Sequence, residues 1–247
     1  MTGNKHLYIV TGTSRGMGAA LAEQLVAPDH VLLCIARRPH PTLGAAAEQW
    51  TLDLADPAPA AGRLQAWLGK LDGATFASAT LINNAAALTR IGPIDACSDA
   101  ELAAALRVGL EAPLLLSAAF LRATRSWQAD KRVLNISSGL GRRAMAGQAS
   151  YCATKAGMDH LSRAMALDES PRSHGAKIVS LAPGVIDTEM QVHLRAGDAS
   201  GFPEKANFVG LKEKGQLASP EAAAARVLAY LARPDFGAQA VADVRDT

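Results

Sequence analysis

Short apolar runs alternate with helical patterns along almost the whole chain, and this alternation constrains the fold more than any other feature. The near-continuous apolar runs lie at residues 7–10, 31–35, 81–82, 133–136 and 178–181. The segments between them repeat apolar residues at three- and four-residue spacing, at residues 19–26, 63–71, 99–123 and 153–167. This order predicts an α/β fold, a doubly wound parallel sheet with helices on both faces.

Length and composition predict a single domain. The 247 residues, 49% of them hydrophobic, suit one domain with a sizeable core, and no linker, repeat or charge block divides the chain. Residues 187–215 differ, with scattered glycines and charges and little periodicity, and structureless loops of this length are usually functional. We expect one domain over residues 1–247, in which 187–215 form an irregular, mobile lid. A helix at 220–232 and a weak strand at 240–244 close the chain.

The charge balance and the apolar runs argue against several classes of partner. Lys and Arg number 25 and Asp and Glu 23, a net charge of +2, so no large basic field attracts nucleic acid or anionic lipid. The longest apolar stretch, 108–121, contains Glu111 and Pro113 and falls short of the roughly 20 residues of a membrane span. The apolar run at 7–10 is too short for a signal peptide. We expect a cytoplasmic protein without nucleic-acid or membrane partners.

The cysteines and histidines show no metal-binding pattern. The three cysteines are widely spaced and contain no C-x-x-C pair, which argues against a disulfide framework and a zinc site. His160, His174 and His193 also lack ligand spacing with other metal-binding residue types. We therefore expect no metal.

A glycine-rich turn follows the first apolar run directly. It reads Thr11-Gly12-Thr13-Ser14-Arg15-Gly16-Met17-Gly18 and leads into an apolar helix. Glycines let the backbone approach a pyrophosphate, which then lies at the positive end of the helix. A plain strand-to-helix connection is the alternative, but strand, turn and helix together favour a dinucleotide site.

The end of the second apolar run indicates which dinucleotide binds. An acidic residue there would accept hydrogen bonds from the ribose 2′-hydroxyl of NAD, but the sequence is Arg37-Arg38, and Arg15 lies in the glycine turn. These guanidinium groups can converge on a 2′-phosphate, so we expect NADP. The alternative is that Arg37 and Arg38 are a solvated loop pair.

Three side chains form a candidate catalytic group. Ser138 follows the apolar run at 133–136, and Tyr151 and Lys155 lie four residues apart, on one face of a helix. A nearby ammonium stabilises a phenolate, so we expect Lys155 to lower the pKa of Tyr151 from about 10. Taken singly, a Tyr-x-x-x-Lys pair is common on helix surfaces; its place after a serine-ended strand and a glycine-rich turn favours catalysis.

Together these motifs resemble the short-chain dehydrogenase/reductase family over nearly the whole chain, which implies a Rossmann-type sheet binding NADP. Asn83-Asn84-Ala85-Ala86 resembles the family's Asn-Asn-Ala-Gly motif, Asp53 its adenine-contacting aspartate, and 183–188 the segment that holds the nicotinamide carboxamide. The cofactor-binding residues implied are Gly12, Ser14, Arg15, Gly16, Met17, Gly18, Arg37, Arg38, Asp53, Leu54, Asn84, Ala85, Ala86, Tyr151, Lys155, Pro183, Gly184, Val185, Ile186 and Thr188.

The resemblance implies hydride transfer between a nicotinamide and a carbonyl or alcohol carbon. Tyr151 would donate the proton in reduction, Ser138 would hold the carbonyl oxygen, and Lys155 would bind the ribose and tune Tyr151. The stretches 112–116 and 180–191 and the C-terminal ending resemble the sepiapterin reductase and benzil reductase branch, which implies an NADPH-dependent, often dimeric reductase of vicinal dicarbonyl compounds. Alternatives are an alcohol dehydrogenase of another substrate class and a catalytically weak NADPH-binding regulator.

The chain departs from the family's pattern at Gly109, where an asparagine normally joins the proton relay. A backbone carbonyl with an extra water could replace that side chain, so we expect activity to survive and Gly109→Asn to change the rate modestly. The remaining candidates line the substrate side. Residues 139–148 and the lid offer Met145, Met190 and Phe202 as apolar walls, or as residues that pack on the rim. Asp243 would anchor a pterin, or be a solvated C-terminal acid.

Overall fold

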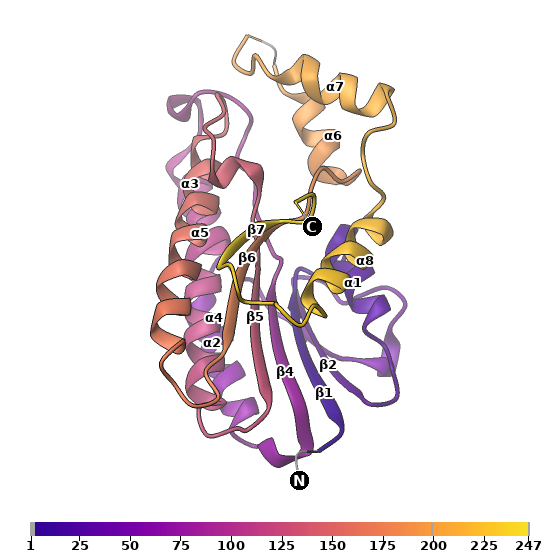
Figure 1. The fold of residues 1–247 in the computed structure, drawn as a ribbon. Helices are drawn as coiled ribbons and strands as arrows, with labels where there is room; N and C mark the ends of the chain where they lie inside the picture. The colour runs from indigo at the N-terminus through magenta and orange to yellow at the C-terminus, as the bar shows by residue number, and fades with distance from the viewer. Residues whose placement is uncertain (1–2, 199, 247) are drawn as a thin grey trace.

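Seven parallel strands form one sheet in the order β3-β2-β1-β4-β5-β6-β7 (Figure 1). This arrangement comes from a computed structural model that describes residues 3–198 and 200–246. The strands are β1 (Lys5–Thr11), β2 (His30–Ala36), β3 (Glu48–Thr51), β4 (Phe76–Asn83), β5 (Asp130–Ile136), β6 (Lys177–Ala182) and β7 (Val241–Asp243). The chain starts in the middle of the sheet, winds outward to β3 and returns through β4 to β7. The predicted doubly wound, single-domain α/β fold is confirmed.

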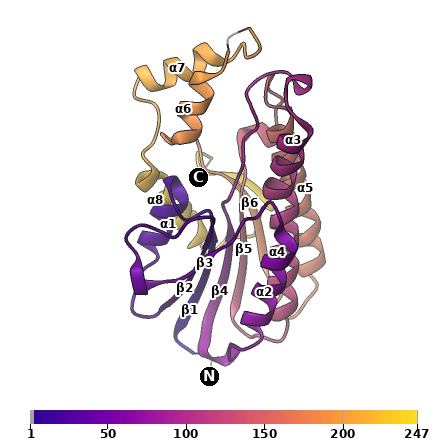
Figure 2. The same cartoon turned by 180° about the vertical axis from the view of Figure 1, so that it is seen from behind.

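Helices cover both faces of the sheet (Figures 1 and 2). One face carries α1 (Gly16–Gln24) and α8 (Pro220–Leu231), and the other carries α2 (Pro57–Leu68), α4 (Ala112–Ala123) and α5 (Ala149–Glu169). Each face has its own apolar core, with Leu21 and Val227 in one and Leu64 and Phe120 in the other, all fully buried. Burial on both faces explains why the central strands are nearly continuous apolar runs.

The long helical segment at 99–123 consists of three parts. Ser98 caps α3 (Asp99–Leu106) in a capping box with Glu101. A π-helical turn, Arg107–Glu111, follows and leads into α4. Asp99–Ala123 is long and apolar enough to cross a membrane by length and composition alone, yet it packs against α2 and α5 inside the fold. Gly109 lies in the middle of the π-helical turn, where it faces α5.

The structure corrects the predicted elements in two places. The edge strand β3 has no apolar run, because only Trp50 of its four residues is buried. The lid segment, 187–215, is not irregular: it contains α6 (Glu189–Ala196) and α7 (Lys205–Glu213). Both helices bury little, since α6 buries only Gln191 and Leu194, and α7 buries none of its residues.

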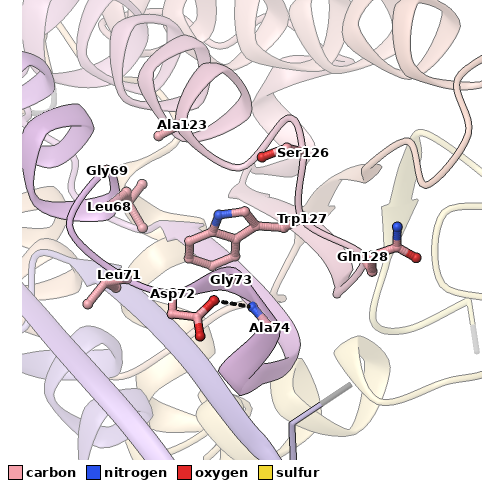
Figure 3. A pocket seen from close by; sticks show the side chains of 10 residues that line it. All are labelled: Leu68, Gly69, Leu71, Asp72, Gly73, Ala74, Ala123, Ser126, Trp127 and Gln128. Atoms are coloured by element: carbon pink, nitrogen blue, oxygen red, sulfur yellow. Dashed lines mark hydrogen bonds between the residues drawn. The ribbon is translucent and has the colours of Figure 1, made fainter. Parts of the chain in front are cut away.

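The two edges of the sheet differ in what they expose. All strands are parallel, so their carboxyl ends meet at one edge, with a topological switch point between β1 and β4 where such sheets bind ligands. At the opposite edge, a pocket of about 400 Å³ lies between the end of α2 and the chain that leads into β5 (Figure 3). Its wall is the indole of Trp127, which stacks on Phe76 with ring centroids 5.4 Å apart. Asp72 is the one ionisable residue among those lining it, and its carboxylate already accepts a hydrogen bond from Ala74 N–H. The active site is therefore expected at the carboxyl edge of the sheet.

Candidate active site

The glycine-rich turn lies at the carboxyl end of β1 and begins α1. Gly12 and Gly16 have φ angles of +75° and +58°, which favour glycine. A Cβ on Gly18 would be 2.1 Å from the carbonyl oxygen of Gly12, so the turn closes directly on backbone. No side chain caps the first turn of α1, and it contains no acidic residue. The N–H groups that lack a side-chain cap and the helix dipole at this end suit a diphosphate, so these residues fit a dinucleotide.

Neighbouring strand ends hold this turn in place. The Asn84 side chain donates a hydrogen bond to the Thr11 carbonyl oxygen at 2.9 Å, and the backbone N–H groups of Asn84 and Ala85 donate to the Thr11 hydroxyl at 3.0 Å each. A Cβ on Gly16 would be 3.4 Å from the methyl group of Thr188, so the segment 183–188 passes beside the turn. The fold thus brings three of the predicted cofactor segments together.

The residues predicted to choose between NAD and NADP lie nearby. Arg15, Arg37 and Arg38 are exposed, and their guanidinium groups form no hydrogen bond or ion pair with any residue that the structure describes. Asp53 is exposed and accepts a hydrogen bond from Ala55 N–H, and Leu54 beside it is buried. The three arginines are therefore free to bind an anionic ligand.

Ser138, Tyr151 and Lys155 meet at the carboxyl end of β5. The Lys155 ammonium donates a hydrogen bond to the Ile136 carbonyl oxygen at 2.6 Å and lies 5.5 Å from the centre of the Tyr151 ring. Burial lowers the pKa of Lys155 to about 8, although the nearby negative charge of Asp159 acts to raise it.

The pKa of Tyr151 differs from our expectation. Burial raises the pKa of Tyr151 to about 12, although a hydrogen bond with Ser138 acts to lower it. Lys155 does not lower the pKa of this phenol, because its ammonium is directed at the Ile136 carbonyl group. At neutral pH the phenol therefore holds its proton, as a proton donor must before it acts.

Sequence reasoning missed a buried carboxylate next to this group. Asp159 is 2% exposed and lies one helical turn after Lys155 on α5. One of its oxygens accepts hydrogen bonds from the hydroxyls of Ser137 and Ser180, both at 2.6 Å, and the other faces Arg142 Nε at 3.5 Å. The signal was available, since an acid four residues after Lys155 lies on the same helix face.

The predicted substrate residues are more deeply buried than expected. Phe202 is fully buried and Met145 is 7% exposed; both pack with Ile91 and Leu194 in a small apolar cluster between the lid segment and the loops below it. Phe202 also stacks on Phe208. Met190 keeps a partly exposed side chain beside this cluster. Phe202 thus joins the lid to the body of the protein and has no surface left to offer a substrate.

Asp243 is neither solvated nor free. It is 4% exposed, and Arg245 binds its carboxylate with two hydrogen bonds, at 2.8 and 2.6 Å. Arg142 Nη1 lies 3.8 Å away, and the hydrogen bonds from Arg245 lower the pKa of Asp243. The expectation of a solvated acid is wrong, because β7 pairs with β6 and draws this residue inside.

Gly109 is in direct contact with the catalytic helix. A Cβ at this position would lie 2.9 Å from both the Cβ and the methyl carbon of Thr154. Thr154 is buried, and its hydroxyl donates a hydrogen bond to the Tyr151 carbonyl oxygen at 2.8 Å. Any side chain at 109, asparagine included, would have to displace Thr154 or move the two helices apart.

Comparison with known proteins assigns the family. The sequence pattern of the short chain dehydrogenases matches residues 6–199. The chain belongs to the short-chain dehydrogenase family. Its members are oxidoreductases that use a nicotinamide cofactor and act on alcohol or carbonyl groups, and this chain is accordingly an enzyme of that kind.

Similar members of the family place the chain on one branch. It is 34% identical over 235 residues to a benzil reductase of Bacillus cereus, named as (S)-benzoin forming, covering 92% of this chain and 94% of that protein. It is 28% identical to sepiapterin reductase of Xenopus tropicalis, covering 91% and 90%. The crystal structure of a short-chain dehydrogenase/reductase from Burkholderia vietnamiensis is 36% identical, with a TM-score of 0.67 and 98% of each chain covered. The predicted relationship to benzil and sepiapterin reductases is confirmed.

Proposed function

We propose that this enzyme is an NADPH-dependent carbonyl reductase that acts on one ketone group of a vicinal dicarbonyl compound. The observation that carries the proposal is the convergence of Ser138, Tyr151 and Lys155 at the carboxyl edge of the sheet, where the uncapped glycine turn also opens. When bound, NADPH supplies the hydride. Similarity to a benzil reductase supports the dicarbonyl class of substrate.

The chain's own residues have separate tasks in this reaction. Ser138, whose hydroxyl interacts with Tyr151, holds the substrate carbonyl oxygen beside the phenol. Tyr151 then donates its proton to that oxygen, which suits a phenol that is fully protonated at neutral pH. Lys155 binds the nicotinamide ribose after its ammonium turns from the Ile136 carbonyl group.

The cofactor preference rests on Arg15, Arg37 and Arg38. Three exposed guanidinium groups without partners in the described chain suit a 2′-phosphate, which accepts bidentate hydrogen bonds from arginine. The glycine turn, Asn84–Ala86 and 183–188 hold the rest of the dinucleotide.

Asp243 supports a neutral diketone rather than a pterin as the substrate. Its carboxylate is already bound by Arg245 and faced by Arg142, so a pterin would have to displace them. The residues of the lid segment, 187–215, then close over the substrate, with Met145 and Met190 nearest its apolar surface.

The proposal includes a homodimer in the cytoplasm. Leu106, Leu114 and Leu167 are between 42% and 75% exposed on α3, α4 and α5, which supports association of copies. Three unpaired cysteines suit a reducing compartment.

The test is NADPH consumption with a panel of benzil, an aliphatic vicinal diketone and sepiapterin. A steroid alcohol is assayed in the reverse direction, by the formation of NADPH from NADP. We expect NADPH to be preferred over NADH and benzil over sepiapterin. Tyr151→Phe should lower turnover about 10³-fold, because the proton donor is lost, whereas Tyr230→Phe, a tyrosine of α8, should leave it unchanged.

Other outcomes would replace this proposal. Oxidation of the steroid alcohol in preference to reduction would indicate an alcohol dehydrogenase of another substrate class. Tight NADPH binding without turnover on any member of the panel would indicate a regulator.

A further inference from the structure

The buried carboxylate of Asp159 is the strongest feature that the proposed reaction does not use. It belongs to α5, but it contacts the ends of two strands through Ser137 and Ser180. Ser137 is the neighbour of Ser138 in the sequence, and Lys155 is one helical turn away. A charge placed here therefore lies close to the supports of Ser138 and Lys155.

The surroundings of Asp159 fix its carboxylate in one position. Two hydroxyl groups donate to one oxygen, and the other oxygen is buried with no hydrogen-bond donor among the described residues. Arg142 faces this second oxygen, and its Nη2 is held by the Ala242 carbonyl oxygen at 2.7 Å. A Cβ on Gly141 would be 2.9 Å from the same oxygen, so the backbone at Gly141 closes over the carboxylate and excludes water.

The charged groups around Lys155 are few. On α5 it is faced by Tyr151 and Asp159, and on β5 by the carbonyl group of Ile136. Around Asp159 itself, the loop after Ser138 contributes Arg142, which also faces Asp243 of β7. Asp159 is thus the one negative charge identified beside the Lys155 ammonium among the described residues.

We propose that Asp159 is a positioning residue whose buried negative charge, one helical turn from Lys155, keeps the Lys155 ammonium protonated at neutral pH. A protonated Lys155 can hold the ribose of the dinucleotide through its ammonium, whereas a neutral amine holds it less well. The role of Asp159 in catalysis rests on the proposed function, whereas its effect on Lys155 can be tested without cofactor or substrate.

Burial and the charge of Asp159 act on the pKa of Lys155 in opposite directions. Desolvation alone would lower the pKa of Lys155 from its ordinary value of 10.5 to below about 8. The charge of Asp159 opposes that fall. Asp159→Asn keeps an oxygen to accept from the serine hydroxyls but removes the charge, so we expect the pKa of Lys155 to fall further.

The first measurement is the pH dependence of kcat/KM for NADPH, which reports groups of the free enzyme. In Asp159→Asn, we expect the loss of activity at alkaline pH to begin about one unit lower than in the wild type. Ser180→Ala is the matched control, because it removes one of the two hydroxyl partners and keeps the charge. Its pH profile should not move, whatever its effect on the rate.

The second measurement needs neither cofactor nor substrate. Between pH 8 and 10.5, the unfolded chain keeps the Lys155 proton that the folded protein has released, so Lys155 makes the free energy of unfolding rise with pH in this window. Cys34, whose pKa burial raises to about 11, acts in the opposite direction and does so equally in both proteins. In Asp159→Asn the rise should start about one unit lower. Lys131, whose pKa is also lowered by burial, contributes equally to both proteins.

The outcomes separate the two proposals. If no dicarbonyl is reduced, the proposed function fails, but the unfolding measurement still decides on Asp159. If Asp159→Asn and Ser180→Ala lose stability and neither changes its pH profile or unfolding window, Asp159 is only structural. Should Asp159→Asn fail to fold, Arg142→Gln is the second variant, because it removes the facing positive charge from a partly exposed position. It should move the pH profile of kcat/KM and the unfolding window to higher pH. A move to lower pH overturns the proposal.

Discussion

Helix α5 contains two buried carboxylates, and the protein holds them in opposite ways. Glu169, the last residue of the helix, is 2% exposed and accepts hydrogen bonds from Arg125, Arg172 and the backbone N–H of Ala176, at 3.0, 2.7 and 3.0 Å. Asp159 is equally buried, but one of its oxygens has no hydrogen-bond donor in the described chain. Glu169 lies at the amino edge of the sheet, and Asp159 near the carboxyl edge.

The difference shows that the two ends of the sheet treat buried charge differently. At Glu169, burial acts to raise the pKa, but the hydrogen bonds from Ala176 and Arg125 outweigh it and the pKa is lowered. That carboxylate is satisfied and joins α5 to its neighbours. Near Asp159, burial instead shifts the pKa values of Tyr151 and Lys155 to about 12 and about 8. Shifted values of this kind are concentrated at functional sites.

Glu169→Gln should produce the largest change in stability and leave the chemistry intact. The substitution removes the negative charge that Arg125 and Arg172 bind. Both arginines are nearly half exposed, so solvent screens the lost interaction, and we expect the free energy of unfolding to fall by about 2 kcal/mol. Urea unfolding at pH 7 measures this loss, and kcat/KM should stay within twofold. Asp168→Asn, the exposed neighbour, should change stability by less than about 0.5 kcal/mol.

The pH dependence of that loss has a defined sign. The pKa of Glu169 is lowered on folding from its ordinary value of 4.5, so its stabilisation is complete above that value and is lost as the pH falls. The difference between wild type and Glu169→Gln should therefore shrink between pH 5 and pH 3. A constant difference across this range would mean that the charge of Glu169 contributes nothing.

Gly109→Ala tests how tightly α5 is held at its catalytic end. The new methyl group would meet buried Thr154 at 2.9 Å, and overpacking of this kind costs about 1–3 kcal/mol, less the gain of about 1 kcal/mol for alanine over glycine in a helix. Gly62→Ala in α2 is the control, since nothing lies within 4 Å of its new methyl group, and it should be stabilising.

Thr154→Ser should recover part of the loss caused by Gly109→Ala. A double-mutant cycle by urea unfolding measures the coupling, which we expect to exceed about 0.5 kcal/mol. If the two changes are additive, or if Gly109→Ala stabilises the protein as much as Gly62→Ala, the helices are not in contact as described.

Much of this structure could be predicted from the sequence, and the failures share a physical reason. Strands buried on both faces leave apolar runs, so β1, β2 and β4 to β6 were visible, whereas the half-exposed edge strand β3 was not. Ser138, Tyr151 and Lys155 were found because spacing and order along the chain reveal them. The contact between Asp159 of α5 and Arg142 of the loop after Ser138 joins two separate segments, so local spacing does not reveal it. The direction of the Lys155 ammonium is not revealed by local spacing either. Burial of Phe202 and Asp243 likewise depends on packing between distant segments.

Arg37→Ala extends the comparison from carboxylates to arginines and should have the smallest effect on the stability of the fold. At the amino edge, Arg125 and Arg172 are bound to Glu169, whereas Arg37 at the carboxyl edge has no partner in the described chain. If that free guanidinium binds the 2′-phosphate, its loss should lower the ratio of NADPH to NADH affinity about tenfold, because one charge-assisted contact to NADPH alone is removed. Fluorescence titration of both dinucleotides measures the ratio. Arg172→Ala should destabilise the fold and leave the ratio unchanged, and an unchanged ratio in Arg37→Ala would assign Arg37 to the solvated surface.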